Sequence, residues 1–378
     1  MPFKPTVKNR LLSTSPSRSW FIGIYDVCIL MCPPGPRWQK SRKLLTPSFH
    51  FNILSRFCDS FTDNSLTLVE KVHEAGEVSI DVFKLMGLIA LDNLCGNLDK
   101  MRSSAIILYK RDVFNILGKR PFTHFFLCQK SHYLSTHFLF IPGKKNLIFL
   151  DQLIEAVEDG SFPFSEQDMR DEVATFMFEG HDTTTSALAF TVWLLGLHPE
   201  CQEKCYEELY SIFQDSDRRP NMDDLSSMKY LEQCIKEGLR LFPSVPQLSR
   251  EVPCDIPMGD YTLPAGTKFI LSVFGLHRDP KYFPDPEKFD PERFTPENSK
   301  GRHPYAYAPF AAGARNCIGQ KFAMMEMKIV ISYLIRNFSF KSSYDQSELY
   351  VVFALILRSA KNLEMTFTPR RKHQHLLS

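Results

Sequence analysis

Residues 310–319 read FAAGARNCIG and run directly into an amphipathic segment, QKFAMMEMKIVISYLIRN. Cys317 therefore stands just before a predicted helix N-terminus, where unpaired N–H groups and the positive end of the helix dipole favour the thiolate over the thiol. This position predicts a soft anionic ligand for a metal ion. A lone cysteine before a helix is usually a buried structural residue, so the prediction depends on the residues around it.

Four neighbours of Cys317 give this loop the features of a ligand site. Gly313 and Gly319 allow a backbone with φ > 0, or the close approach of a flat ligand where any Cβ would clash. Arg315 supplies a cation for an acidic group on that ligand, and Phe310 would shield the sulfur from water. Five residues at fixed offsets favour a ligand site over a structural cysteine.

A second candidate site lies in residues 165–198, which contain no proline and predict one long helix. Its motif EGHDTT places the carboxylates of Glu179 and Asp182 beside the hydroxyl of Thr183. In mid-helix a threonine tends to bond to the carbonyl four residues earlier and to loosen the helix. Such a notch can hold a small ligand and deliver protons to it. A polar patch against solvent or another helix is the alternative.

Two arginine motifs predict ion pairs. Glu237 and Arg240 lie at i and i+3 in KEGLR, and Arg293 follows in PERF. An exposed i,i+3 pair would add only ~0.3 kcal/mol, whereas a three-way bidentate network would be a buried structural clamp. Trp38 and Arg42, at i and i+4 in WQKSRK, could present an indole N–H and a guanidinium to one anion. Taken alone, a surface pair is the better interpretation of these two residues.

The composition is that of a globular chain. Hydrophobic residues make up 44% and charged residues 23% of the 378 residues, and the net charge of +2 gives no footprint for nucleic-acid binding. The ten cysteines show no regular spacing, so reduced thiols on the cytosolic side are expected. The apolar run at residues 20–32 is broken by Asp26 and is shorter than the ~20 residues of a spanning helix, so no transmembrane or targeting segment is predicted.

The periodicity predicts a mainly α-helical protein with a small β element. Between residues 250 and 310, short β-like runs are broken by Pro and Gly, while residues 1–36 and 100–150 show no sustained period. A chain of this length allows two or three domains or one large one. Apolar residues recur at helical spacing over about 38–99, 165–198, 199–213, 226–241 and 319–336.

Together the motifs FAAGARNCIG, KEGLR, PERF, EGHDTT and WxxxR resemble the haem-thiolate cytochrome P450 mono-oxygenases. The resemblance covers about 38–99 and 149–368 in order. Longer stretches, among them FMFEGHDTTTSAL and GRHPYAYAPFAAGARNCIGQKFAMMEMK, look like the family-4 branch of microsomal fatty-acid ω-hydroxylases. The resemblance implies the cytochrome P450 fold as one haem domain over 38–378 with a divergent stretch at 100–148, and it leaves 1–37 unassigned.

The resemblance also implies haem b as the cofactor and a role for each candidate residue. Cys317 is then the proximal ligand of the haem iron. Thr183 with Asp182 is the acid–alcohol pair that relays protons to dioxygen, and Glu179 is the residue that forms an ester with a haem methyl group. The implied partners of the haem propionates are Arg315, Trp38, Arg42 and Arg250.

The implied reaction inserts one oxygen atom of O2 into a C–H bond of an apolar, fatty-acid-like substrate, at its ω position, and reduces the other atom to water. The chain holds no flavin or nicotinamide motif, so electrons from NADPH require a separate flavoprotein reductase, with a cytochrome b-type protein as a second implied donor. Lys321 and Lys328 after the cysteine loop would suit an acidic partner. The family also implies the cytosolic face of the endoplasmic reticulum membrane, although the anchor is absent from this chain.

The sequence departs from the family in two places. It reaches the WxxxR helix by residue 38, and residues 100–145 are shorter than the usual helices E to H, which form most of the substrate mouth. The expected fold is therefore incomplete at the N-terminus and in the E-to-H region. Two alternatives stay open: a catalytically silent haem-binding or non-folding fragment, and a sterol-type hydroxylase, which Glu179 disfavours.

Overall fold

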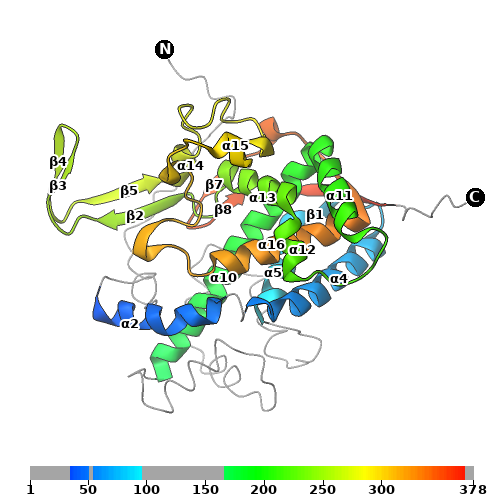
Figure 1. Cartoon of the computed structure of the whole chain (residues 1–378), viewed down its shortest axis with the longest axis horizontal. Helices are drawn as coiled ribbons and strands as arrows, with labels where there is room; N and C mark the ends of the chain where they lie inside the picture. The colour runs from blue at the N-terminus through cyan, green and yellow to red at the C-terminus, as the bar shows by residue number, and fades with distance from the viewer. Residues whose placement is uncertain (1–34, 51–53, 96–165, 371–378) are drawn as a thin grey trace, which may run out of the picture. The chain divides into compact units, whose positions relative to one another are not determined.

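The computed structural model describes residues 35–50, 54–95 and 166–370 (Figure 1). They fall into two compact units. The larger unit contains residues 54–94 and 179–370, and the smaller one contains 35–50 with 166–178. Helix α10 (Glu166–Leu197) contributes to both units.

The described residues are mainly helical with short strands, which confirms the predicted fold class (Figure 1). The α-helices are α2 (Pro36–Leu45), α4 (Phe57–Ala75), α5 (Val82–Cys95), α10, α11 (Pro199–Phe213), α12 (Met222–Ser227), α13 (Lys229–Leu241), α14 (Val273–Leu276), α15 (Pro296–Ser299) and α16 (Gln320–Asn337). The strands are β1 (Ile80–Asp81), β2 (Gln247–Glu251), β3 (Ile256–Met258), β4 (Tyr261–Leu263), β5 (Lys268–Ser272), β6 (Phe338–Ser342), β7 (Val351–Phe353), β8 (Leu357–Ser359) and β9 (Glu364–Pro369).

All the strand pairs of the larger unit are antiparallel. One sheet has the order β1-β9-β6, and three two-stranded ladders pair β2 with β5, β3 with β4, and β7 with β8. Gly259 turns the chain between β3 and β4 with a φ of 59°, a left-handed conformation that glycine adopts without a steric cost. The β2–β5 and β3–β4 ladders extend to one side of the larger unit (Figure 1).

The core of the larger unit is built around α10 and α16. Phe190 and Trp193 on α10 are fully buried, and residues 325–335 of α16 are buried on every side of the helix. Helix α16 packs along α4 and also contacts α11 and α13. A helix that is buried all round belongs to the interior of a large domain, so the segment that follows the cysteine loop is firmly held.

Helix α13 approaches α10 very closely at Gly238. A Cβ added there would lie 2.5 Å from the Oγ1 atom of Thr191, so a larger residue would force the helices apart. The predicted apolar stripe of α13, Leu231, Ile235 and Leu239, is buried. The KEGLR motif is therefore carried by a helix whose position is fixed by packing.

The smaller unit holds α2 and the short 3-10 turn Thr46–Phe49. Proline at the first position of α2 suits a helix start, because proline has no N–H to satisfy there. The Thr46 hydroxyl donates to the Arg42 carbonyl over 2.6 Å, and the Phe49 ring stacks on Phe176 with centroids 5.7 Å apart.

Most predicted helix bounds are correct to one residue. The predictions over 165–198, 199–213 and 319–336 correspond to α10, α11 and α16. The prediction of one helix over 226–241 is wrong, because Met228, with a ψ of 72°, separates α12 from α13. The predictions for 1–34 and 96–165 lie outside the described residues.

The start of α12 also differs from the prediction. A reciprocal capping box, in which Asn221 caps the helix and the Asp224 side chain accepts from the Asn221 N–H, begins α12 at Met222.

Across the described ranges, no helix combines the length and apolar character needed to cross a membrane.

Candidate active site

The cysteine loop turns sharply before α16. The Cys317 N–H donates to the Phe310 carbonyl over 2.9 Å, which closes a loop whose tip is the 3-10 turn Gly313–Arg315. Gly313 has a φ of 76° and Ala311 a φ of 56°, so the backbone is left-handed on both sides of Ala312. The loop delivers Cys317 to an exposed position three residues before the first residue of α16.

The outer surface of this loop fits a flat ligand. Ala312, Gly313 and Ala314 are exposed along with Cys317, and their side chains are too small to stand in the way of a planar group. The positive φ at Gly313 agrees with the prediction for that residue. At Gly319 the first of the two predicted alternatives, a positive φ, is not observed, and the close approach of a flat ligand stays a prediction. Gly319 has a φ of −86° because it caps the N-terminus of α16, and a Cβ there would lie 3.9 Å from the Cys317 sulfur.

Two side chains that sequence reasoning missed hold the approach to the loop. The Ala308 N–H donates to Nε2 of His277 over 2.9 Å, and the Tyr307 hydroxyl donates to the Lys236 carbonyl over 2.8 Å. Burial, followed by the charge of Arg240, lowers the pKa of His277 to about 3. His277 is therefore neutral at physiological pH and can accept through Nε2. The sequence signal that could have indicated His277 is the HRDP segment, residues 277–280.

Glu237 and Arg240 form a completely buried ion pair. Arg240 donates through Nε and Nη2 to the two oxygens of the Glu237 carboxylate over 2.7 and 2.8 Å. The Nε atom of Arg293 lies 3.5 Å from Glu237 Oε1, and the Asp290 N–H donates to the same oxygen over 2.8 Å. Burial raises the pKa of Glu237, and the bonds from Arg240 oppose that rise. The sequence predicted these three residues as one clamp, and the structure brings them together.

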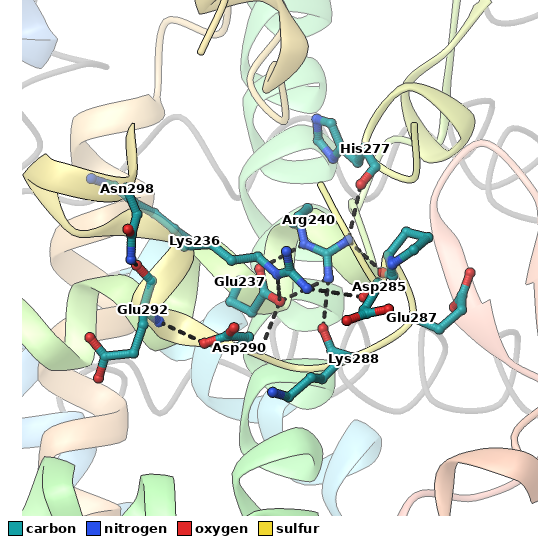
Figure 2. A network of polar contacts seen from close by, with 12 residues as sticks. Lys236, Glu237, Arg240, His277, Asp285, Glu287, Lys288, Asp290, Glu292 and Asn298 are labelled. Carbon is teal, nitrogen blue, oxygen red and sulfur yellow. Dashed lines mark hydrogen bonds and ion pairs between the residues drawn. The ribbon is translucent and has the colours of Figure 1, made fainter. Parts of the chain in front are cut away.

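The clamp extends further than the three predicted side chains. Arg240 also donates to the carbonyls of His277, Pro286 and Lys288 over 3.0, 2.7 and 3.0 Å. Figure 2 shows the guanidinium at the centre of this network, with the carbonyls converging on it from the segment after α14. The clamp therefore fixes the segment of residues 277–293 to α13.

Three consecutive threonines of α10 bond back to the helix. The hydroxyls of Thr183, Thr184 and Thr185 donate to the carbonyls of Glu179, Gly180 and His181. This confirms the predicted back-bond of Thr183, but α10 stays helical without a break. The Thr183 carbonyl also accepts from Ser244 Oγ over 2.7 Å, a contact with the segment after α13 that the sequence did not indicate.

Asp182 is buried and held by an arginine from a distant strand. Both of its carboxylate oxygens accept from Nη2 of Arg358 on β8, over 2.6 and 2.7 Å. The Asp182 side chain is 5% exposed and that of Arg358 is 23% exposed. Sequence reasoning missed Arg358, which is 176 residues away and lies in no recognised motif.

Glu179 lies one turn before Thr183 on the same helix. Burial, followed by the negative charge of Asp182, raises the pKa of Glu179 to about 7. Its carboxyl group is therefore present in both protonation states near neutral pH. His181 points elsewhere, since its Nε2 bonds to the Gly87 carbonyl over 3.0 Å, and burial lowers the pKa of His181.

The four arginine and tryptophan candidates lie on three different elements. Arg315 is half-buried within the cysteine loop, and Arg250 is exposed on β2, where its Nη1 donates to the Ser249 carbonyl over 2.8 Å. Trp38 and Arg42 lie one turn apart on α2 in the smaller unit. The roles of these residues toward a cofactor stay predictions.

The expectation that Lys328 is presented to an acidic partner is wrong. Lys328 is 7% exposed, and its Nζ donates to the Glu232 carboxylate over 2.6 Å and to the Leu225 carbonyl over 2.7 Å. Its position on a helix that is buried all round explains the difference. Lys321, in the first turn of α16, is exposed.

Comparison with known proteins identifies the family. Residues 12–103 and 120–367 match the family model "Cytochrome P450". The chain is 38% identical to cytochrome P450 4c3 of Drosophila melanogaster over 386 residues, which covers 88% of this chain and 72% of that protein. It is also 38% identical to cytochrome P450 4V2 of Homo sapiens over 379 residues, with the same coverage.

A solved structure supports the fold. The haem domain of a cytochrome P450DA mutant superposes with a TM-score of 0.78 at 22% sequence identity, covering 96% of this chain and 84% of that one. The exposed cysteine, the small side chains of its loop and the left-handed Gly313 fit the haem that this family binds. The chain therefore belongs to the cytochrome P450 family of haem-dependent mono-oxygenases and resembles members of its family 4.

Proposed function

We propose that this mono-oxygenase hydroxylates fatty-acid-like substrates at the ω carbon, with electrons from NADPH delivered by a flavoprotein reductase. The observation that carries the proposal is Glu179. Its buried carboxyl lies on α10, one turn before Thr183, and its pKa is raised to about 7. This is the position that esterifies a haem methyl group in the family-4 hydroxylases that the sequence resembles.

Different residues of this chain would bind different parts of the cofactor. Cys317 would hold the haem iron as a thiolate, and haem so bound supplies the activation of O2. Arg315, Arg250, Trp38 and Arg42 would bind its propionates. Phe310 would exclude water from the sulfur, which helps to keep the thiolate electron-rich.

Thr183 and Asp182 would manage the protons. The Thr183 hydroxyl donates to the Glu179 carbonyl and can rotate to donate toward the site. Arg358 holds the Asp182 carboxylate by hydrogen bonds to both of its oxygens, and 23% of the Arg358 side chain is exposed to solvent. Protons would therefore pass from solvent near Arg358 to the Asp182 carboxylate and reach the site through the Thr183 hydroxyl, while the Arg358 guanidinium keeps its own protons.

Glu179 would restrict which carbon of the substrate reacts. A terminal methyl C–H bond is stronger than its neighbours, so ω selectivity requires that only the chain end reaches the reactive centre. An ester would join a Glu179 oxygen to a haem methyl carbon in place of one hydrogen. This two-electron oxidation uses the O2-dependent turnover of the enzyme itself as the oxidant and gives water. A cofactor fixed to α10 would narrow and stiffen the channel.

The reductase would dock near the cysteine loop. Lys321 is exposed in the first turn of α16, four residues after Cys317, and suits an acidic partner surface. A cytochrome b-type donor would use the same surface. By its resemblance to microsomal enzymes, the protein would act at the cytosolic face of the endoplasmic reticulum membrane. Cell fractionation with a reductase marker tests this location.

The test of activity uses protein expressed with a haem precursor. A Soret band of the reduced carbon-monoxide complex at the position typical of thiolate ligation is expected, and turnover of a medium-chain fatty acid with NADPH and reductase should give mainly the ω-alcohol. Soluble, folded protein without that band would instead identify a silent fragment. Turnover of a sterol but not of fatty acids would point to a sterol-type hydroxylase.

A separate test addresses the ester. Acidified organic solvent should leave haem on the wild-type protein after turnover and extract it fully from Glu179→Gln. Complete extraction of haem from both proteins would exclude the ester, and it would leave the proposal of mono-oxygenase activity unaffected. Because Glu179→Gln cannot form the ester, its hydroxylation should shift from the ω carbon toward the neighbouring carbon of the chain.

A further inference from the structure

Three sulfur atoms converge in the core of the larger unit, away from the cysteine loop. The Cys58 Sγ on α4 lies 3.5 Å from Sδ of Met222 on α12 and 3.7 Å from Sδ of Met325 on α16. We propose that Cys58, Met222 and Met325 form a binding site for a soft monovalent metal ion, Cu(I). The three side chains come from three helices that meet in the larger unit.

Hydrogen bonding alone does not account for this arrangement. A thiol has one proton to donate and a thioether sulfur is only a weak acceptor, so Cys58 can satisfy one of its two methionine neighbours. The other thioether sulfur lies within contact distance of the same sulfur without receiving its proton. A cation between the three sulfurs would use all of these lone pairs at once.

The two distances from the Cys58 sulfur to the thioether sulfurs are close to those of a three-coordinate site. With metal–sulfur bonds of about 2.3 Å, three sulfurs arranged as a triangle around an ion lie about 4 Å apart. The observed separations of 3.5 and 3.7 Å are shorter by a few tenths of an ångström. Methionine has three rotatable bonds, so a small outward rotation of the two side chains opens the triangle.

The donor set and its charge select the ion. One thiolate and two thioethers are soft ligands, which Cu(I) prefers over oxygen and nitrogen donors. A thiolate with a monovalent ion is neutral, whereas a divalent ion would leave a net positive charge in an apolar surrounding. Among the described residues, no three His, Cys, Asp or Glu side chains form a metal site, so thioether donors distinguish this cluster.

The surroundings give protection and access. The rings of Phe57 and Phe61 lie edge-on to Phe322, with centroids 5.4 and 5.0 Å away, and each ring is within three residues of Cys58 or Met325 in the sequence. Cys58 and Met325 are 6% and 5% exposed, while Met222 is half-buried and offers a path from solvent. Metal binding by a cysteine requires the thiolate, so binding displaces the Cys58 thiol proton into solvent.

The test is an anaerobic Cu(I) titration of the haem-loaded protein in competition with a coloured Cu(I) chelator. Every sample carries the substitution Cys254→Ser, because Cys254 is an exposed thiol that could bind Cu(I) on its own. Met222→Leu takes away one thioether but no thiol, and Met228→Leu, a buried methionine at the end of the same helix, is its matched control.

One Cu(I) per chain is expected, with affinity reduced at least about tenfold by Met222→Leu and unchanged by Met228→Leu. X-ray absorption of the copper-loaded parent should show three sulfur ligands. Absence of bound copper, equal affinities in the two variants, or an absorption spectrum with fewer than three sulfurs would overturn the proposal. The absorption measurement needs no variant, so it decides the matter even where a substitution impairs folding.

Discussion

The contact between Arg358 and Asp182 allows a quantitative prediction. Arg358→Met keeps an aliphatic stem but removes the guanidinium, and it leaves the Asp182 carboxylate, 5% exposed, without the two N–H···O contacts of 2.6 and 2.7 Å. Breaking one side of a buried pair costs ~3–5 kcal/mol. Because Arg358 is 23% exposed and partly screened, the lower end applies, and the free energy of unfolding should fall by about 3 kcal/mol.

The assay is denaturant unfolding followed by circular dichroism, supported by a thermal scan. For a chain of this size the melting temperature should drop by roughly 6 °C, at roughly 2 °C per kcal/mol. The substitution also leaves the charge of Asp182 uncompensated beside Glu179. The pKa of Glu179, already raised to about 7, should therefore rise further.

A double-mutant cycle isolates the pair. Asp182→Asn removes the charge that Arg358 neutralises, so Asp182→Asn combined with Arg358→Met should recover most of the stability lost in Arg358→Met alone. A coupling free energy indistinguishable from zero would refute the reasoning, because the pair would then be a contact without energetic consequence.

Three further predictions follow from other parts of the structure. Cys317→Ser should abolish the thiolate-type carbon-monoxide band while leaving the far-ultraviolet circular dichroism unchanged, and a retained band would exclude Cys317 as the ligand. Gly238→Ala should lower the free energy of unfolding by ~1–3 kcal/mol, because its Cβ would lie 2.5 Å from Thr191 Oγ1. Adding Thr191→Ala should recover part of that loss in denaturant unfolding. If it recovers nothing, the strain does not arise from this contact. Burial raises the pKa of Glu326 from 4.5 to about 8, so the native state holds this proton more tightly than the unfolded chain, and stability should fall as pH rises between those values. Glu326→Gln should flatten that fall in unfolding curves measured from about pH 5 to about pH 9, and an unchanged slope would assign the pH dependence to other groups.

Local features of this fold were predictable from the sequence. The bounds of α10 and α11 follow from proline positions and helical periodicity, and the ion pair of Glu237 and Arg240 follows from their i,i+3 spacing. Each of these signals lies within a few residues of the feature it predicts. The start of α12 had such a signal as well, in Asn221 and Asp224, although the apolar periodicity that placed a helix at 226 did not include it.

Contacts between distant segments were not predictable in the same way. Nothing near Arg358 marks it as the partner of Asp182, because the pairing depends on how β8 packs against α10. Lys328 was misjudged for a related reason. A lysine in a helix is usually solvated, and tertiary contacts with the Glu232 carboxylate and the Leu225 carbonyl satisfy the buried ammonium of Lys328. The Cys58 cluster likewise joins residues 164 and 267 positions apart.

The tie between α10 and β8 also constrains the order of folding. Ser186 on α10 donates to the Leu357 carbonyl of β8. The Leu357 N–H donates to the Ser244 carbonyl, so hydrogen bonds beside Arg358 also hold β8 in place. During synthesis, α10 emerges long before β8, and Asp182 must stay hydrated while α11 to α16 form. Docking of β8 onto α10 is therefore expected to be a late event in folding, reached only after the cysteine loop exists.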